Sequence, residues 1–86
     1  MRINMYSPSG IQFEGEAMSL NVPTRAGEIT ILDHHRPLIS ILKKGKAVVV
    51  QTNGEKLEYE IESGFLEMDP DNTLTVLMHD HYEKNS

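Results

Sequence analysis

The segment VPTRAGEITILDHHRPL, residues Val22–Leu38, decides the fold of this chain because turn and strand signals alternate within it. Pro23 ends one strand and Gly27 permits a tight reversal, since proline lacks the backbone N–H of a sheet ladder and glycine accepts positive φ. A second strand follows, in which apolar side chains alternate with polar ones. This order of signals predicts two strands joined by a short turn, and it does not indicate a catalytic arrangement.

Polar side chains occupy one face of that second strand and the corner after it. Glu28 and Thr30 alternate with Ile29 and Ile31, so a carboxylate is expected at an exposed strand start. The corner that follows, Asp33–Arg36, is polar throughout and is closed by a proline before the next apolar run. A polar loop at a rigid corner is typical of a surface that contacts a partner.

Alternation with a period of two residues extends over almost the whole chain and predicts an all-β fold. The apolar positions with this spacing are Ile3 and Met5; Ile11 and Phe13; Met18, Leu20 and Val22; Ile29 and Ile31; Leu57, Tyr59 and Ile61; Leu74, Val76 and Met78. Turn signals separate these runs at short intervals, which is typical of a sandwich or a barrel. No window has the 3.6-residue apolar stripe of an ordinary helix.

The strongest turn signal is Asn53-Gly54, because a two-residue type I′ turn requires positive φ at both central positions. It predicts a hairpin that joins residues 47–52 with residues 55–61. A weaker signal is Asp69–Thr73, which has oxygen-bearing side chains at alternate positions, as a calcium loop does. Its sixth position is Leu74, where such a loop requires glycine, so we interpret this segment as a turn.

The 86 residues are expected to form a single β-sandwich domain over 1–86, with a core over 1–80 and a polar tail over 81–86. The absence of cysteine excludes disulfides and thiolate metal sites. The net charge of -5 argues against a nucleic-acid or anionic-membrane surface. The one cluster of basic residues, Lys43, Lys44 and Lys46, is interpreted as a solvated turn.

No apolar run approaches the roughly 20 residues of a membrane-spanning helix. The N-terminal residues lack the apolar region of a secretion signal, which predicts a protein that stays in the cytoplasm.

The chain offers weak signals for chemistry. His79 and His81 would project to one face of a strand, as a two-histidine metal site demands, but no third ligand has a suitable spacing. Ser63 lacks the preceding glycine of a nucleophile elbow, and Gly45-Lys46 lacks the rest of a phosphate-binding loop. We therefore expect no catalytic residue, no cofactor and no metal.

A set of residues that spans nearly the whole chain resembles the N-terminal β-sandwich of the F-type ATP synthase epsilon subunit. The residues that carry the resemblance are Pro8, Gly10, Phe13 and Gly15; Gly27-Glu28; Ile31-Leu32; His35; Pro37-Leu38; Gly45; Ser63-Gly64-Phe65-Leu66-Glu67; and Thr75-Val76-Leu77. Each piece is weak by itself, and the combination is specific. The resemblance implies a flattened two-sheet sandwich of about ten short strands.

The resemblance also implies a non-catalytic subunit at the foot of the rotor's central stalk. There it would couple ion-driven rotation of the membrane ring to ATP synthesis in the catalytic head, as a peripheral part of the complex at the cytoplasmic face of the cell membrane. It implies contacts with the ring loops at Glu28, Thr30 and Asp33, and contacts with the gamma subunit at Ser7, His35 and Arg36. Affinity is expected from apolar anchors, for which Tyr6, Ile39, Tyr59 and Met68 are candidates.

Two departures from the family pattern affect these expectations. Asp33 and Arg36 stand where the family more often has proline and alanine, so the corner is more charged. The sequence ends before the helical hairpin that blocks ATP hydrolysis in longer members. We expect a short form that couples without this arm, and the alternative is a fragment from which the arm was cut away. The alternative from the residues alone is a stand-alone β-sandwich binding module for a small polar ligand, and an independent enzyme ranks third.

Overall fold

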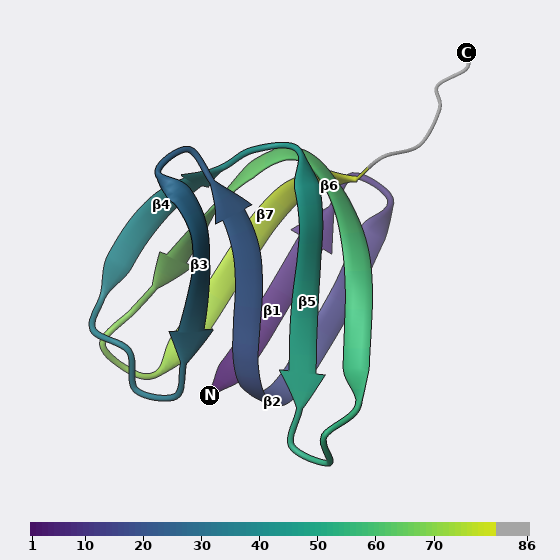
Figure 1. The fold of residues 1–86 in the computed structure, drawn as a ribbon. Coiled ribbons are helices and arrows are strands. Elements are labelled where there is room, and N and C mark those ends of the chain that lie inside the picture. Colours follow the sequence, from purple (N-terminus) through teal and green to yellow (C-terminus); the bar gives the residue numbers. More distant parts are fainter. Residues whose placement is uncertain (81–86) are drawn as a thin grey trace.

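The computed structural model describes residues 1–80, and all their regular structure is β-strand (Figure 1). The seven strands are β1 (Arg2–Ser7), β2 (Gly10–Thr24), β3 (Gly27–Leu32), β4 (Leu38–Leu42), β5 (Gly45–Gln51), β6 (Lys56–Met68) and β7 (Thr73–Asp80). The all-β class is confirmed. The polar tail expected at 81–86, which includes His81, lies outside the described residues.

The strands form a sandwich of two layers. The long strands β2 and β6 pass from one layer into the other and so connect the layers in one hydrogen-bonded sheet. In one layer, the second half of β2 pairs with β3 and β5, and β5 pairs with the first half of β6. In the other layer, β1 lies between the first half of β2 and β7, and the second half of β6 lies between β7 and β4. The expectation of about ten strands was therefore too high, since β2 and β6 each contribute to both layers.

Each long strand changes layer near a β-bulge. The register of β2 shifts between Ala17 and Ser19, and that of β6 shifts between Ile61 and Ser63. An extra residue reverses which side chains face the core, because side chains alternate with a period of two. Met18, which the alternation groups with Leu20 and Val22, therefore lies at the bulge and is 51% exposed. Ile11, expected in the same pattern, is also exposed.

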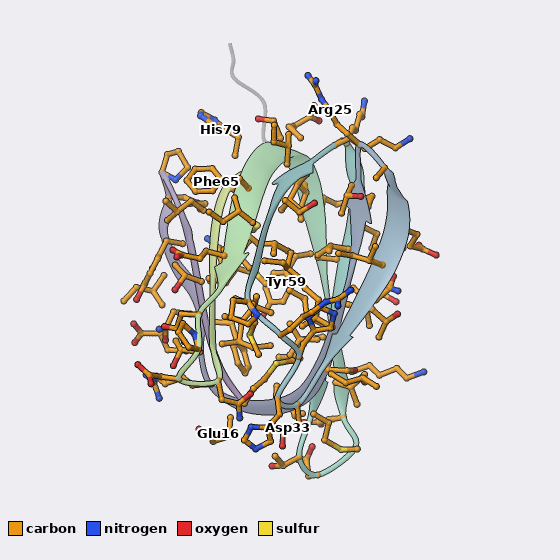
Figure 2. The ribbon with its side chains drawn as sticks, turned by 90° about the vertical axis from the view of Figure 1, so that its left-hand side faces the viewer. Glu16, Arg25, Asp33, Tyr59, Phe65 and His79 are labelled. Carbon is orange, nitrogen blue, oxygen red and sulfur yellow. The ribbon has the colours of Figure 1, made fainter. Side chains whose placement is uncertain are left out.

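The core fills the space between the layers and includes most of the apolar positions that alternate in the sequence. Its buried side chains are Met1, Ile3, Met5, Ala17, Leu20, Val22, Ile31, Leu42, Ala47, Val49, Ile61, Leu66, Met68, Leu74, Val76 and Met78. Tyr59 packs against this cluster and donates its hydroxyl to Gln12 O at 3.2 Å, and Figure 2 shows it between the layers. Burial raises the pKa of Tyr59.

The predicted hairpin is present, since β5 and β6 pair antiparallel from Gly45↔Ile61 to Val50↔Lys56. Its turn is wider than the two-residue type I′ turn that was expected. Gly54 N donates to Gln51 O at 2.8 Å, and Gln51 N donates to Glu55 O at 2.8 Å. Only Gly54 has positive φ, so the loop is a three-residue connection with glycine in the left-handed position.

The interpretation of Asp69–Thr73 as a turn is confirmed. Asp69 Oδ1 accepts hydrogen bonds from Asp71 N at 2.8 Å and from Thr73 N at 3.1 Å. The carboxylate therefore organises the backbone between β6 and β7, and Asn72 adopts the positive φ of 62° that closes the turn.

Candidate functional site

The two ends of the sandwich carry different side chains (Figure 2). Asp33 and Glu16 lie at one end, which we call the corner end because it holds the segment 33–37. Arg25, Phe65 and His79 lie at the opposite end, which we call the turn end. Strand β1 begins at the corner end and reaches the turn end at Ser7, so its length of about 20 Å separates Ser7 from the corner end.

Asp33 ties the corner to two distant parts of the chain. Its Oδ1 accepts hydrogen bonds from the N-terminal ammonium of Met1 at 2.6 Å and from Asn72 Nδ2 at 2.9 Å. The same ammonium donates to Ala17 O at 3.1 Å and lies 3.5 Å from Glu16 Oε1. Asp33 thus serves an internal contact, in addition to any contact with a partner.

These contacts shift two titrations in opposite directions. The hydrogen bond from the N-terminal ammonium, followed by that from Asn72, lowers the pKa of Asp33. Burial by itself would lower the pKa of the ammonium, but the hydrogen bond and charge of Asp33, with help from Glu16, raise the pKa overall. The two groups therefore stabilise each other's charged form.

The rest of the corner is held by contacts between backbone groups and side chains. His34 has a φ of 59°, and its N–H donates to Asn72 Oδ1 at 2.7 Å. The His35 Nδ1 lies 2.7 Å from Arg36 O, within hydrogen-bond distance. The Arg36 side chain is exposed. The corner is therefore a pre-formed polar surface, as the sequence predicted.

Glu28 and Thr30 lie on the outer face of β3, as the alternation predicted. Both side chains are exposed. The Thr30 hydroxyl accepts a hydrogen bond from Asn21 Nδ2 at 2.7 Å across the β2–β3 pair. Glu28 is next to the β2–β3 turn at the turn end, whereas Asp33 is at the corner end, so the three predicted ring-contact residues extend along the full length of β3.

Ser7 borders a hollow of about 360 Å³ at the turn end. Tyr6, Pro8, Phe65, Leu77 and His79 are among the residues that line it. Its lining is largely apolar, which suits an apolar side chain of a partner.

The hollow continues into a row of apolar side chains across the outer face of one layer, which we call the apolar row. The register places neighbours side by side on five successive strands: Ile41 on β4, Phe65 on β6, Leu77 on β7, Tyr6 on β1 and Ile11 on β2. Four of the five are exposed large apolar residues, and Tyr6 is half-buried. Exposed apolar rows of this kind are typical of surfaces that contact a partner.

Sequence reasoning missed most of this row. Tyr6 and Ile39 remain available as anchors, since Ile39 is exposed beside the row on β4. Met68 is buried in the core and Tyr59 is packed against it, so neither is a surface anchor. The sequence signal that could have revealed the row is the presence of apolar residues on both faces of a strand, as in β4 and directly after Gly64.

The outer face of the other layer is polar by comparison. Lys46 Nζ lies 3.2 Å from Glu58 Oε1, and the pair between Asn21 and Thr30 lies on the same layer. Within residues 1–80, no group of three histidine or carboxylate side chains is placed to hold a metal ion. The described part of the chain also contains no helix of the length and apolarity needed to span a membrane.

The sequence matches the family described as ATP synthase, Delta/Epsilon chain, beta-sandwich domain, over residues 1–84. The chain belongs to this family. The predicted resemblance is therefore confirmed, and the expectation of a non-catalytic subunit agrees with it.

Curated relatives support the same assignment. The chain is 39% identical over 77 residues to the ATP synthase subunit delta, mitochondrial, of Yarrowia lipolytica, covering 88% of this chain and 48% of that protein. It is 40% identical over 77 residues to the ATP synthase epsilon chain of Stenotrophomonas maltophilia, covering 90% of this chain and 54% of that protein. The chain thus spans about half the length of the curated relatives it matches.

Solved structures share the fold. A chain in the mitochondrial ATP synthase of Euglena gracilis, solved as OSCP/F1/c-ring, superposes with a TM-score of 0.83 at 19% identity over 88% of this chain and 48% of that chain. A chain in the central stalk/c-ring structure of Tetrahymena thermophila ATP synthase gives a TM-score of 0.78 at 15% identity over 96% of this chain and 66% of that chain.

Proposed function

We propose that this chain is the epsilon subunit, called delta in mitochondria, of the central stalk of a rotary ATP synthase. In this role it transmits ion-driven rotation of the membrane ring to the catalytic head and carries out no reaction itself. The observation that carries the proposal is the family match over residues 1–84. The subunit would sit at the cytoplasmic face of the cell membrane, held there through the complex.

The apolar row is the surface best suited to the gamma subunit. Burial of several large apolar side chains supplies affinity, and the hollow beside Ser7 would receive one of the partner's apolar side chains. His35 and Arg36 would add polar contacts at the corner end, about the length of one strand away. Contacts at both ends would resist rotation of the sandwich against its partner.

The outer face of β3 is the surface proposed for the ring loops. Glu28 and Thr30 are exposed there, and Asp33 continues the polar surface to the corner end. An exposed ion pair contributes only about 0.2–1 kcal/mol, so Glu28 would set the register of docking more than its affinity.

Charge reversal at Glu28 tests the ring contact. A tagged chain should co-purify with the gamma subunit and the membrane ring, and Glu28→Arg should loosen the link between ATP hydrolysis and ion pumping in membrane vesicles. Glu55→Arg is the matched control, because it makes the same charge change on an exposed side chain in the β5–β6 turn. Equal coupling in the two variants would contradict the role of Glu28.

Polar substitution in the apolar row tests the gamma interface. Leu77→Gln should weaken co-purification of the gamma subunit at least tenfold, because Leu77 is 42% exposed at the centre of the row. Met18→Gln is the control, since Met18 is 51% exposed and lies outside the row. Retention of gamma by both variants would remove the apolar row from the proposal.

The alternative of a small-ligand module gains no support from the hollow at the turn end. Its lining is mostly apolar, whereas a small polar ligand requires several converging polar groups.

A further inference from the structure

Strand β3 has one edge that carries no partner strand among residues 1–80. It pairs with β2 along its whole length, from Thr24↔Gly27 to Ser19↔Leu32. It is the terminal strand of the sheet order, and β4, which follows it in the chain, pairs with β6 and with Thr24 of β2. In Figure 1, β3 lies beside β2 at the border of its layer.

The pairing of Pro23 with Glu28 shows which backbone groups of β3 point outward. Pro23 has no N–H, and its carbonyl accepts from Lys43 N at 3.0 Å on the side of β2 away from β3. Pro23↔Glu28 is therefore a pair without ladder hydrogen bonds, and every second pair after it shares this property. The N–H and C=O groups of Glu28, Thr30 and Leu32 thus point away from β2.

These outward groups lack the devices that usually protect a sheet edge. Proteins block such edges with lysine, proline, bulges or covering segments. Strand β3 has no lysine, proline or bulge, and its one charge is Glu28. On β4, by contrast, Ile41 O accepts a hydrogen bond from Arg25 N at 3.1 Å, so the C-terminal end of that strand's edge already has a backbone partner. Of the outward groups on β3, only Leu32 O has a backbone partner within residues 1–80, the N–H of His35 at 3.1 Å.

We propose that the edge of β3 binds an extended segment of a rotor partner by β-strand addition, with a basic residue of that segment opposite Glu28. The inference rests on the proposed function and deepens it, because it turns a side-chain contact at Glu28 and Thr30 into a backbone pairing. The segment would hydrogen-bond with Thr30 and cover Leu32, which is 58% exposed. The Asp33 contacts hold the end of β3 in place before the segment binds, which lowers the entropic cost of binding.

Charge favours a basic segment over a second copy of this chain. Antiparallel pairing of two β3 strands about Thr30 would place Glu28 opposite Leu32, with no cation to compensate the carboxylate. Two copies would also each bring a net charge of -5. A basic extended segment places opposite charges side by side and completes the ladder.

Amide hydrogen exchange tests the pairing directly. In the free chain, the outward amides of Glu28, Thr30 and Leu32 should exchange quickly, and in the assembled synthase they should exchange on the order of 100-fold more slowly. If the chain assembles and these amides exchange equally fast in both states, the strand addition is overturned while the proposed function stands. If the chain does not assemble with the gamma subunit and the ring, both are overturned.

A proline variant provides the second test. Thr30→Pro removes an outward N–H and leaves the β2–β3 ladder donors in place, which edge strands tolerate. Thr30→Ala is the matched control, because it also loses the hydroxyl that accepts from Asn21 but keeps the amide. We expect Thr30→Pro to reduce incorporation into the synthase at least tenfold more than Thr30→Ala does. Equal incorporation of the two variants would overturn the proposal, and if Thr30→Pro fails to fold, the exchange experiment decides.

Discussion

Substitution of Gly64 by alanine should destabilise the fold much more than substitution of a glycine in an open turn. Gly64 lies within β6, just after the bulge, with a φ of 154° that side-chain-bearing residues rarely adopt. A Cβ added there would overlap Leu77 O of β7 and lie 2.8 Å from Met78 Cα. Carbon atoms at optimal contact are about 3.5–4.0 Å apart, so β7 would have to move by about 1 Å.

The expected cost follows from this geometry. Backbone strain contributes about 1–3 kcal/mol, and displacement of β7 weakens one or two ladder hydrogen bonds at about 1 kcal/mol each. The variant should lose about 2–5 kcal/mol of unfolding free energy, against a total of about 4–13 kcal/mol for a domain of this size. Because Gly64 also lines the hollow at the turn end, the same shift would change the proposed gamma surface.

Gly54→Ala is the matched control for this prediction. Gly54 also has positive φ, at 89°, but a Cβ there would meet nothing within 4 Å. Backbone strain alone should cost about 1–2 kcal/mol. Urea unfolding followed by circular dichroism would measure both, since the two variants should share one slope and differ in midpoint. Midpoints within experimental error of each other would refute the argument that the β6–β7 approach requires glycine.

Three further predictions test the corner and the core. The pKa of Asp33 is lowered from 3.8, so the stabilisation from its carboxylate is present above about pH 4 and is lost as the pH falls through the lowered pKa. The pKa of the N-terminal ammonium is raised from 8.0, so its stabilisation is present below pH 8 and is lost as the pH rises through the raised pKa. Urea midpoints measured across this range should therefore fall at both extremes, and Asp33→Asn should flatten both limbs; an unchanged profile would contradict the pairing. Asn72→Gly keeps the backbone freedom needed at a φ of 62° but removes the hydrogen bonds with Asp33 and His34. It should lower the free energy of unfolding in urea by about 1 kcal/mol. No loss would show that these exposed hydrogen bonds contribute nothing to stability. Leu66→Ala should cost about 2–5 kcal/mol in the same assay, because Leu66 is fully buried between the layers, and a loss under 1 kcal/mol would mean that the core collapses onto the vacated space.

Local patterns in the sequence were sufficient for the class of the fold, most of its core and the nature of its corner. Alternation placed Leu74, Val76 and Met78 inside, because a strand's two faces are determined by residue parity alone. Asn53-Gly54 located a hairpin, although the turn around it is wider than expected. The polar corner at Asp33–Arg36 was identified from its composition.

The bulges, the apolar row, the Asp33 contacts and the open edge of β3 were decided by tertiary structure. Each depends on which strands lie next to each other, and local alternation carries no information about that. Phe65 and Leu77 are twelve positions apart, yet the pairing of β6 with β7 places them side by side. The sequence by itself thus determined which residues prefer strands and which faces are apolar, whereas the surfaces offered to partners arose only when cross-strand hydrogen bonding set the register between distant segments.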